Sequence, residues 1–223
     1  MGRGFESLQG TKPEHCSGFL FKENSLDQYF INNENLKSEI KEITCWCGTR
    51  MLTFETDRGI FSRNEIDDAS LFMVRNVPEL NGNVLDLGCG YGFVGIYCAV
   101  RFPEIQITLC DINRRAVELT KRNMEKNEIS GNVVCSDGFD GLQNKAFDFI
   151  LFNPPIHAGR DSINSMFMDS VMSLRENGVL YTVMRKKHGA KSSLDFLNTF
   201  SNSRIINREK DILLIASSRR EGN

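Results

Sequence analysis

The fold of this chain is decided by the stretch Val84-Leu85-Asp86-Leu87-Gly88-Cys89-Gly90-Tyr91-Gly92-Phe93-Val94-Gly95. Its first residues have the apolar character of a buried strand, and a helix is expected to start near Phe93. The glycines between them permit a tight turn and a close approach of ligand to backbone, while the helix N-terminus adds unpaired N–H donors. We therefore predict a ligand-binding turn between a strand and a helix.

Outward from this turn, short β-branched runs alternate with amphipathic segments. The expected strands cover residues 84–88, 105–111, 132–137, 147–153, 178–184, 204–207 and 211–216, and the expected helices cover residues 93–101, 114–127, 165–175 and 192–200. Such alternation is typical of an α/β fold whose mostly parallel sheet carries helices on both faces. We predict a doubly wound, seven-stranded sheet that binds its ligand beyond the C-terminal strand ends, where the strand order reverses.

The N-terminal third of the chain has a different sequence pattern from this core. Residues 1–24 mix Gly, Ser, Lys and Glu without a period, which is typical of a flexible arm. Strand-forming residues flank Gly48-Thr49 and predict a β-hairpin over residues 36–54. The predicted organisation is an arm followed by one domain over residues 25–223, with a hairpin cap and cofactor lid over residues 25–75 and a catalytic core over residues 76–223.

Composition limits the functional classes. A chain of 223 residues suits one catalytic domain, and no apolar run reaches the roughly 20 residues of a membrane span. The first residues lack the pattern of a secretory signal, so we expect no membrane partner and a cytoplasmic protein. Seven cysteines, of which only Cys45 and Cys47 lie close together, match no common zinc spacing, and we expect reduced thiols and no metal.

The net charge of −2 does not favour a general affinity for nucleic acid, so an RNA site must be a local basic patch. One candidate is the predicted helix that carries Arg114, Arg115, Lys121 and Arg122, which fits a solvated helix face better than a binding surface. The other candidate follows a predicted strand end, where substrates bind. It consists of Arg185, Lys186, Lys187, His188 and Lys191.

The glycine turn alone leaves two cofactor classes open. Residues 90–95 also fit the dinucleotide pattern G-x-G-x-x-G, and Asp111 follows at the distance of a ribose partner. Asp86 favours another ligand, because a carboxylate at the turn repels a pyrophosphate but complements an α-ammonium. Asp111 and Asp137 then end the next two strands, where they can accept hydrogen bonds from ribose hydroxyls and from the adenine amine. Three acids at successive strand ends match S-adenosyl-methionine.

The fourth strand ends in Asn153-Pro154-Pro155. Consecutive prolines fix φ and supply no N–H, so the turn presents a stiff set of acceptors at the cleft. An exocyclic amine is a poor nucleophile because its lone pair is delocalised into a π system. Acceptors at Asn153 Oδ1 and at the Pro154 carbonyl would localise that lone pair on nitrogen and aim it at the methyl group. We predict Asn153, Pro154 and Pro155 as the catalytic turn.

Taken together, these residues resemble the class I S-adenosyl-methionine-dependent methyltransferases of the small-domain (MTS) group, which includes rRNA guanine-N2 methyltransferases and single-domain archaeal and bacterial relatives. The resemblance covers residues 25–223. It rests on Asp27-Gln28-Tyr29-Phe30, Gly59-Ile60-Phe61-Ser62 with Asp67 and Ser70, the glycine turn, DINRRA from Asp111, NPPIHAG from Asn153, and HGAKS from His188. It implies a Rossmann-like methyltransferase sheet.

The resemblance also implies roles for individual residues. Cofactor contacts are expected from Asp86, Gly88, Gly90, Gly92, Asp111, Asp137 and Asn153. Phe61, Asp67 and Ser70 are expected in a lid over the cofactor, and substrate contacts from Ile156, His157, Arg185, Lys187 and Lys191. The chain departs from the family where Ile156 replaces a common aromatic residue and Ala69 a common glycine.

The expected activity is methylation of an exocyclic amine, guanine N2 of ribosomal RNA in first place, by a monomer or a homodimer that binds RNA. A protein glutamine amide presents the same donor geometry to the same turn and is the main alternative. Two other classes stay open: an NAD-dependent oxidoreductase, which leaves the Asn-Pro-Pro turn unexplained, and a non-catalytic RNA-binding protein on a methyltransferase fold.

Overall fold

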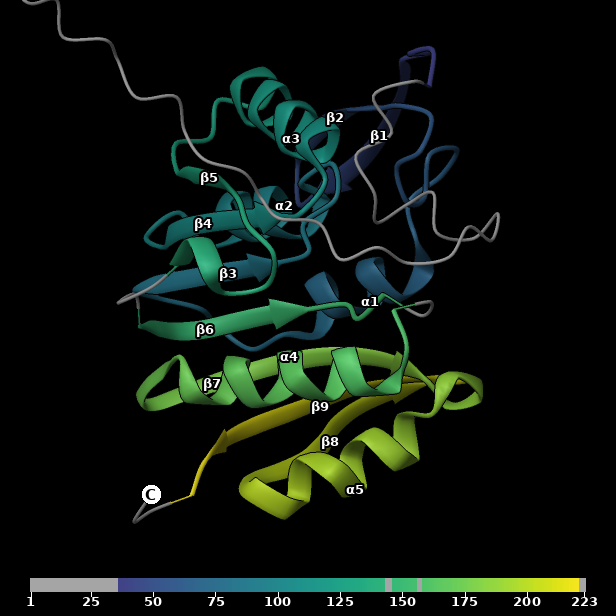
Figure 1. The fold of residues 1–223 in the computed structure, drawn as a ribbon. Coiled ribbons are helices and arrows are strands. Elements are labelled where there is room, and N and C mark those ends of the chain that lie inside the picture. Colours follow the sequence, from purple (N-terminus) through teal and green to yellow (C-terminus); the bar gives the residue numbers. More distant parts are fainter. Residues whose placement is uncertain (1–35, 143–145, 156–157, 221–223) are drawn as a thin grey trace, which may run out of the picture.

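The computed structural model describes residues 36–142, 146–155 and 158–220 (Figure 1). Its centre is a seven-stranded sheet with the order β5-β4-β3-β6-β7-β9-β8. The strands are β3 (Asn83–Leu87), β4 (Gln106–Asp111), β5 (Asn132–Cys135), β6 (Phe147–Phe152), β7 (Leu174–Arg185), β8 (Ser201–Glu209) and β9 (Ile212–Arg219). The predicted α/β fold is confirmed.

The strand order reverses at the middle of the sheet. From β3 the chain passes to β4 and β5 on one side, and then returns to β6 and β7 on the other. These five strands are parallel, whereas β9 runs antiparallel to both β7 and β8. The reversal leaves a crevice beyond the ends of β3 and β6, which is where ligands bind in such sheets.

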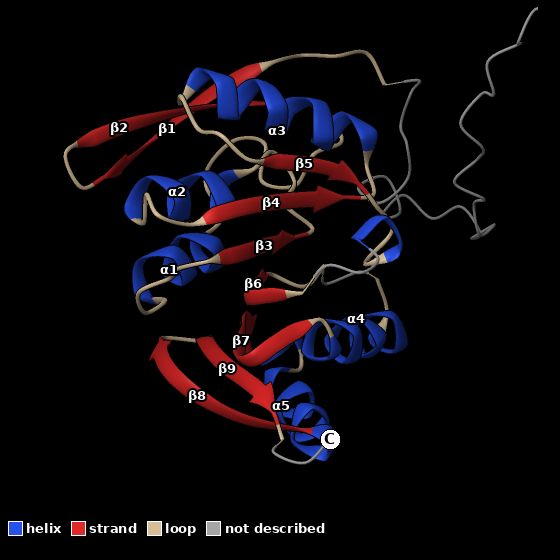
Figure 2. Ribbon diagram, turned by 90° about the vertical axis from the view of Figure 1, so that its left-hand side faces the viewer, coloured by secondary structure: helices blue, strands red, loops and turns tan. Residues whose placement is uncertain are grey.

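Helices cover both faces of the sheet. The helices are α1 (Asp68–Asn76), α2 (Phe93–Arg101), α3 (Arg114–Lys126), α4 (Arg160–Met172) and α5 (Ala190–Phe200). Figure 2 shows α1 and α2 on one side and α4 and α5 on the other. Alternate strand residues pack in two separate cores. Val84 belongs to the core on the side of α1 and α2, and Leu85 to the core on the side of α4 and α5. Buried strands in a doubly wound sheet require this arrangement.

The hairpin cap lies against α2 and α3 and consists of β1 (Lys41–Cys47) and β2 (Arg50–Thr56). The predicted hairpin is confirmed, whereas the boundary between the predicted arm and domain lies outside the described residues. Two buried asparagines, Asn123 in α3 and Asn127 at its C-cap, bind the main chain of β2 as a neighbouring strand would. Asn123 accepts from Glu55 N (2.7 Å) and donates to Glu55 O (2.9 Å), and Asn127 makes the same pair of bonds with Thr53 at 3.1 and 2.8 Å.

Asn123 joins three parts of the molecule, because its Nδ2 also donates to Tyr91 O in the glycine turn at 2.8 Å. We expect Asn123→Ala to lower the free energy of unfolding by about 2–4 kcal/mol, since buried backbone groups lose their partners. Urea denaturation measures the change. Lys121→Ala on the exposed side of the same helix is the control and should change it by less than about 0.5 kcal/mol; equal effects would contradict the structural role of Asn123.

Three element boundaries differ from the sequence-based prediction. Helix α1 was not predicted as a helix; it begins after Asp67, whose side chain accepts from Ser70 N at 2.8 Å as an N-cap. Helix α4 begins at Arg160, five residues early, and ends at Met172. Strand β7 starts at Leu174, inside the predicted helix, because Leu174 pairs with Phe147 before a register shift.

Candidate active site

A cavity of about 450 Å³ lies at the crevice where the strand order reverses, within the size range of small-molecule sites. Its wall includes the ends of β3, β4, β6 and β7 and the segments that follow them, together with the start of α1 and the loop before it. Most of the predicted site residues line it, namely Asp86, Gly88, Gly90, Asp111, Asp137, Asn153, Pro154, Pro155, Arg185, Phe61, Asp67 and Ser70. The structure therefore brings the predicted cofactor, amine and lid residues into one site.

The glycine turn forms an open cradle in this wall. Gly88 and Gly90 have φ values of +70° and +58°, and a Cβ at either position would meet no atom within 4 Å. Side chains there would project into the space that a ligand needs. Gly92 differs: it does not line the cavity, and a Cβ would lie 3.0 Å from Thr120 Cγ2. Its prediction as a cofactor contact is corrected to a packing role at the start of α2.

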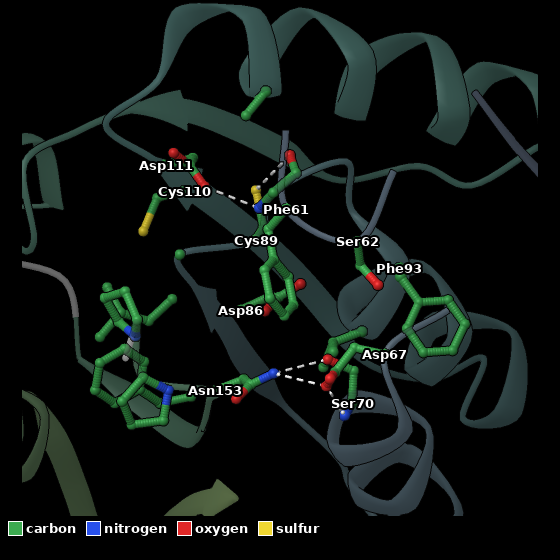
Figure 3. A pocket seen from close by; sticks show the side chains of 18 of the residues that line it. Phe61, Ser62, Asp67, Ser70, Asp86, Cys89, Phe93, Cys110, Asp111 and Asn153 are labelled. Atoms are coloured by element: carbon green, nitrogen blue, oxygen red, sulfur yellow. Dashed lines mark hydrogen bonds between the residues drawn. The ribbon is translucent and has the colours of Figure 1, made fainter. Parts of the chain in front are cut away.

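Asp86 is buried at the floor of the cavity (Figure 3). Its Oδ2 accepts from Gly95 N at 2.8 Å, so one oxygen holds the start of α2 against β3. No described residue donates to Oδ1. Burial raises the pKa of Asp86 to about 7, because no cation compensates for the lost hydration. An ammonium group placed in the cavity would supply that compensation, which suits the methionine end of the predicted cofactor.

Because folded Asp86 keeps a proton that the unfolded chain releases near its ordinary pKa of 3.8, the free energy of unfolding of the ligand-free protein should fall between about pH 4 and about pH 7. The contribution is present below the unfolded pKa and is lost as pH rises through the folded one, by up to about 4 kcal/mol. Urea denaturation across this range measures it. Asp86→Asn should flatten the profile; a slope as steep as that of the wild type would contradict the assignment.

Asp111, at the end of β4, contacts the glycine cradle. Its Oδ2 accepts from Gly90 N and its Oδ1 from Asn113 N, both at 2.8 Å. Burial raises its pKa. The carboxylate thus shapes the glycine turn besides facing the cavity, a role that the sequence did not indicate. Each carboxylate oxygen retains a further acceptor position for ribose hydroxyls. Asp137 is exposed at the cavity wall and follows β5 by two residues.

Described residues hold Asn153 through the nitrogen of its side-chain amide and not through the oxygen. Its Nδ2 donates to Ser70 Oγ at 2.9 Å and to Asp67 Oδ2 at 3.3 Å (Figure 3). A carboxylate oxygen only accepts hydrogen bonds, so the nitrogen and not the oxygen of the amide must face Asp67. No described residue donates to Asn153 Oδ1. The amide oxygen is therefore an available acceptor in the cavity wall, next to Pro154 and Pro155.

The predicted lid divides into two parts. Phe61 stands at the cavity wall with half of its surface exposed (50%), and a ligand can cover that ring. Asp67 and Ser70 instead belong to the start of α1 and contact Asn153. The direct partners of the predicted catalytic asparagine are thus residues assigned by resemblance to a lid.

The basic segment after β7 does not act as one patch. Arg185 lines the cavity but lies 3.3 Å from Asp211, 3.8 Å from Asp68 and 3.9 Å from Asp67, so three carboxylates surround its charge. Its contact with substrate stays a prediction, and a phosphate would have to compete with these carboxylates for the guanidinium. Lys187 and Lys191 are exposed and do not line the cavity. Ile156 and His157 lie outside the described residues.

Several apolar residues of the cavity were not predicted. Ile112 follows Asp111 and is 38% exposed, although it is apolar, and Ile163 and Met166 reach the cavity from α4. The sequence signal for Ile112 was its place directly after the strand-end acid Asp111. These side chains give the cavity the mainly apolar wall that favours burial of an aromatic ring.

Comparison with known proteins identifies the family. Residues 51–216 match the model of the family described as methyltransferase small domain. The chain belongs to this family. An uncharacterised protein of Bacillus subtilis, YbxB, is 32% identical to this member over 198 residues, which cover 86% of the chain and 98% of the relative.

Two relatives carry functional names. Ribosomal RNA small subunit methyltransferase C of Vibrio parahaemolyticus is 38% identical over 128 residues, which cover 57% of this methyltransferase small domain protein and 37% of the relative. The T. thermophilus 16S rRNA N2 G1207 methyltransferase, solved with AdoMet and guanosine, superposes with a TM-score of 0.70 at 23% identity. That match covers 83% of this chain and 52% of the solved one. The chain therefore spans much less than the full length of either relative.

Family membership makes the protein a methyltransferase with S-adenosyl-methionine as cofactor, and it excludes the nicotinamide alternative. The residues fit that cofactor: the open glycine cradle, the desolvated Asp86 and the acceptor Asp111 line one cavity. In the described part of the chain, no group of three or more acidic, histidine or cysteine side chains could hold a metal ion. No described helix is long and apolar enough to cross a membrane.

Proposed function

We propose that residues 25–223 form one methyltransferase domain that methylates an exocyclic amine, guanine N2 of ribosomal RNA. One observation carries the amine assignment: the acceptor turn of Asn153 and Pro154 lies in the same cavity wall as the glycine cradle. The preference for ribosomal RNA rests on the two relatives described above, which act on small-subunit rRNA by their names, one of them at guanine N2.

S-adenosyl-methionine, when bound, supplies an electrophilic methyl group on its sulfonium. The residues of this chain prepare the acceptor. Asn153 Oδ1 and the Pro154 carbonyl accept hydrogen bonds from the two hydrogens of the amine, which draws its lone pair out of the π system and fixes its direction. Apolar side chains of the wall, such as Met166, exclude water and strengthen both hydrogen bonds. No nucleophilic side chain is required, because the amine nitrogen itself would attack; the sulfur–methyl bond would break as the nitrogen–carbon bond forms, and the methylated nitrogen would then release one proton to water.

The test is transfer of labelled methyl groups to unmodified 16S rRNA, to assembled small ribosomal subunits and to ribosomal proteins, followed by nucleoside and amino-acid analysis. We expect labelled N2-methylguanosine. Label in glutamine side chains would replace the RNA proposal with the protein alternative. Cofactor binding without transfer to either fraction would favour the non-catalytic RNA-binding alternative.

Lys187 and Lys191 remain our proposed RNA contacts, because they are exposed just beyond the end of β7. Replacing both with alanine should flatten the log–log salt dependence of RNA binding by about one unit per lost phosphate contact and leave cofactor affinity unchanged. The control is Lys121→Ala, which removes an exposed cation that pairs with Glu118 on α3. If the Lys187 and Lys191 double variant keeps the wild-type slope, as the Lys121→Ala control should, the two lysines are only part of a solvated surface.

A further inference from the structure

We propose that Asp67 and Ser70 are positioning residues that hold the Asn153 amide with its oxygen toward the methyl acceptor, and that this restricts the site to acceptor atoms that carry hydrogen. The proposal rests on the proposed amine methylation. It assigns the start of α1 a part in acceptor choice, which is distinct from covering the cofactor.

The orientation follows from the chemistry of the two partners. Asn153 Nδ2 has two acceptors, Ser70 Oγ at 2.9 Å and Asp67 Oδ2 at 3.3 Å. Rotation of the amide by 180° would place its oxygen against a carboxylate and would break the bond to Asp67. Asp67 therefore excludes the rotated state, and Ser70, whose hydroxyl can donate as well as accept, adds a bond to the observed state.

Asp67 is itself held in place from two directions. Its Oδ2 accepts from Ser70 N at 2.8 Å, so the helix cap and the asparagine contact share one carboxylate oxygen. On the other side, Arg185 at the end of β7 lies 3.9 Å from Asp67 Oδ1 and 3.3 Å from Asp211. The network thus ties α1 to the end of β7 and to the turn between β8 and β9. Asn153, at the end of β6, is thus oriented through α1, which the network connects to the end of β7 and to the turn between β8 and β9.

The held orientation of Asn153 selects among possible methyl acceptors. In the held orientation, the asparagine presents its oxygen to the cavity and keeps its nitrogen on Ser70 and Asp67. An amine donates a hydrogen bond from its N–H to that oxygen. A ring nitrogen without hydrogen would instead place its lone pair against the lone pairs of the oxygen, which is repulsive. An unheld amide could rotate and donate to such a nitrogen instead. Asp67 and Ser70 therefore favour an exocyclic amine over a ring nitrogen as the methyl acceptor.

The orientation can be tested without any substrate. In protein labelled with ¹⁵N asparagine, the Asn153 side-chain signals are those that disappear in Asn153→Ala. Their hydrogen exchange with water should be at least about tenfold slower than that of the exposed Asn64, and Ser70→Ala should raise it by about tenfold. Exchange as fast as that of Asn64 in the wild type would overturn the proposal.

A kinetic cycle tests the consequence for turnover. Ser70→Ala should lower kcat about tenfold in the wild-type background, with little change in cofactor Kd, and should have no further effect in Asn153→Ala. Ser201→Ala is the matched control, because it removes a buried hydroxyl that bonds to Leu197 O at 2.8 Å and does not line the cavity. Equal losses from Ser70→Ala in both backgrounds would show a merely structural role.

The carboxylate is tested by a conservative pair. Asp67→Asn keeps an acceptor that can cap α1 and bind Asn153, so it should lose less kcat than Asp67→Ala, with melting temperatures measured for both. Equal kcat losses in the two variants would overturn the role of Asp67. If the wild type transfers no methyl group to RNA, the function proposed above fails, whereas the exchange measurement still decides the orientation of Asn153.

Discussion

Asn153→Ala is expected to lower kcat by about 10²–10³-fold and to leave cofactor affinity nearly unchanged. The loss has the size seen when one preorganised polar group is removed from a reacting centre. Asn153 Nδ2 is anchored to Ser70 and Asp67, so the side chain arrives at the acceptor already oriented and needs no rearrangement during methyl transfer. Single-turnover rates with saturating cofactor, together with calorimetry of S-adenosyl-homocysteine binding, measure both quantities.

Asn153→Asp is the informative companion. A carboxylate still accepts from the amine, so partial activity should remain, but it lacks the Nδ2 donor that Ser70 and Asp67 hold. It would also place a second negative charge near Asp67 Oδ2, which is 3.3 Å from the wild-type nitrogen. If Asn153→Ala lost cofactor binding while transfer per bound cofactor stayed intact, the turn would be structural and the acceptor site would lie elsewhere.

Asp111→Ala should weaken cofactor binding by about 2–4 kcal/mol, the loss expected when charge-assisted hydrogen bonds to a buried ribose disappear. Part of this loss comes from the protein, because Asp111 Oδ2 also fixes Gly90 N at 2.8 Å and thus the shape of the cradle. Calorimetry with S-adenosyl-homocysteine measures the change. An unchanged affinity would contradict the assignment.

Asp137→Ala is the internal comparison for Asp111. Asp137 is exposed at the wall, and an adenine ring gains apolar contacts from neighbours such as Ile112, so the loss there should be smaller. A larger loss at Asp137 than at Asp111 would mean that the ribose and adenine positions are the reverse of those proposed.

The fold could be predicted because its signals are local. The apolar run that starts at Val84 and the glycines that follow specify a strand and a turn from neighbouring residues alone. Helix α1 was missed for the opposite reason: its cap Asp67 and its residue Ser70 had been explained as a lid, although their spacing also fits an N-cap. The start of β7 at Leu174 depends on pairing with Phe147, 27 positions away, which no local pattern contains.

The candidate site, like the fold, could be predicted from sequence only in part. Strand ends of a parallel sheet meet at one edge, so Asp86, Asp111 and Asn153 could be expected together from sequence. The sequence did not indicate what each acid does besides facing a ligand, because Gly95 and Gly90 become partners only when the turn closes. The counterions of Arg185, Asp67 and Asp211, could not be predicted because they come from distant parts of the chain.

The asparagines that bind the hairpin cap have a consequence for how this surface can evolve. The side-chain amides of Asn123 and Asn127 hydrogen-bond to main-chain atoms of β2, at Thr53 and Glu55, and these four bonds do not depend on which side chains the strand carries. Substitutions on the outward face, where Trp46 and Met51 stand opposite each other at 61% and 54% exposure, leave those bonds intact. The exterior of the cap can therefore diverge toward new partners while these main-chain bonds continue to attach it to the catalytic core.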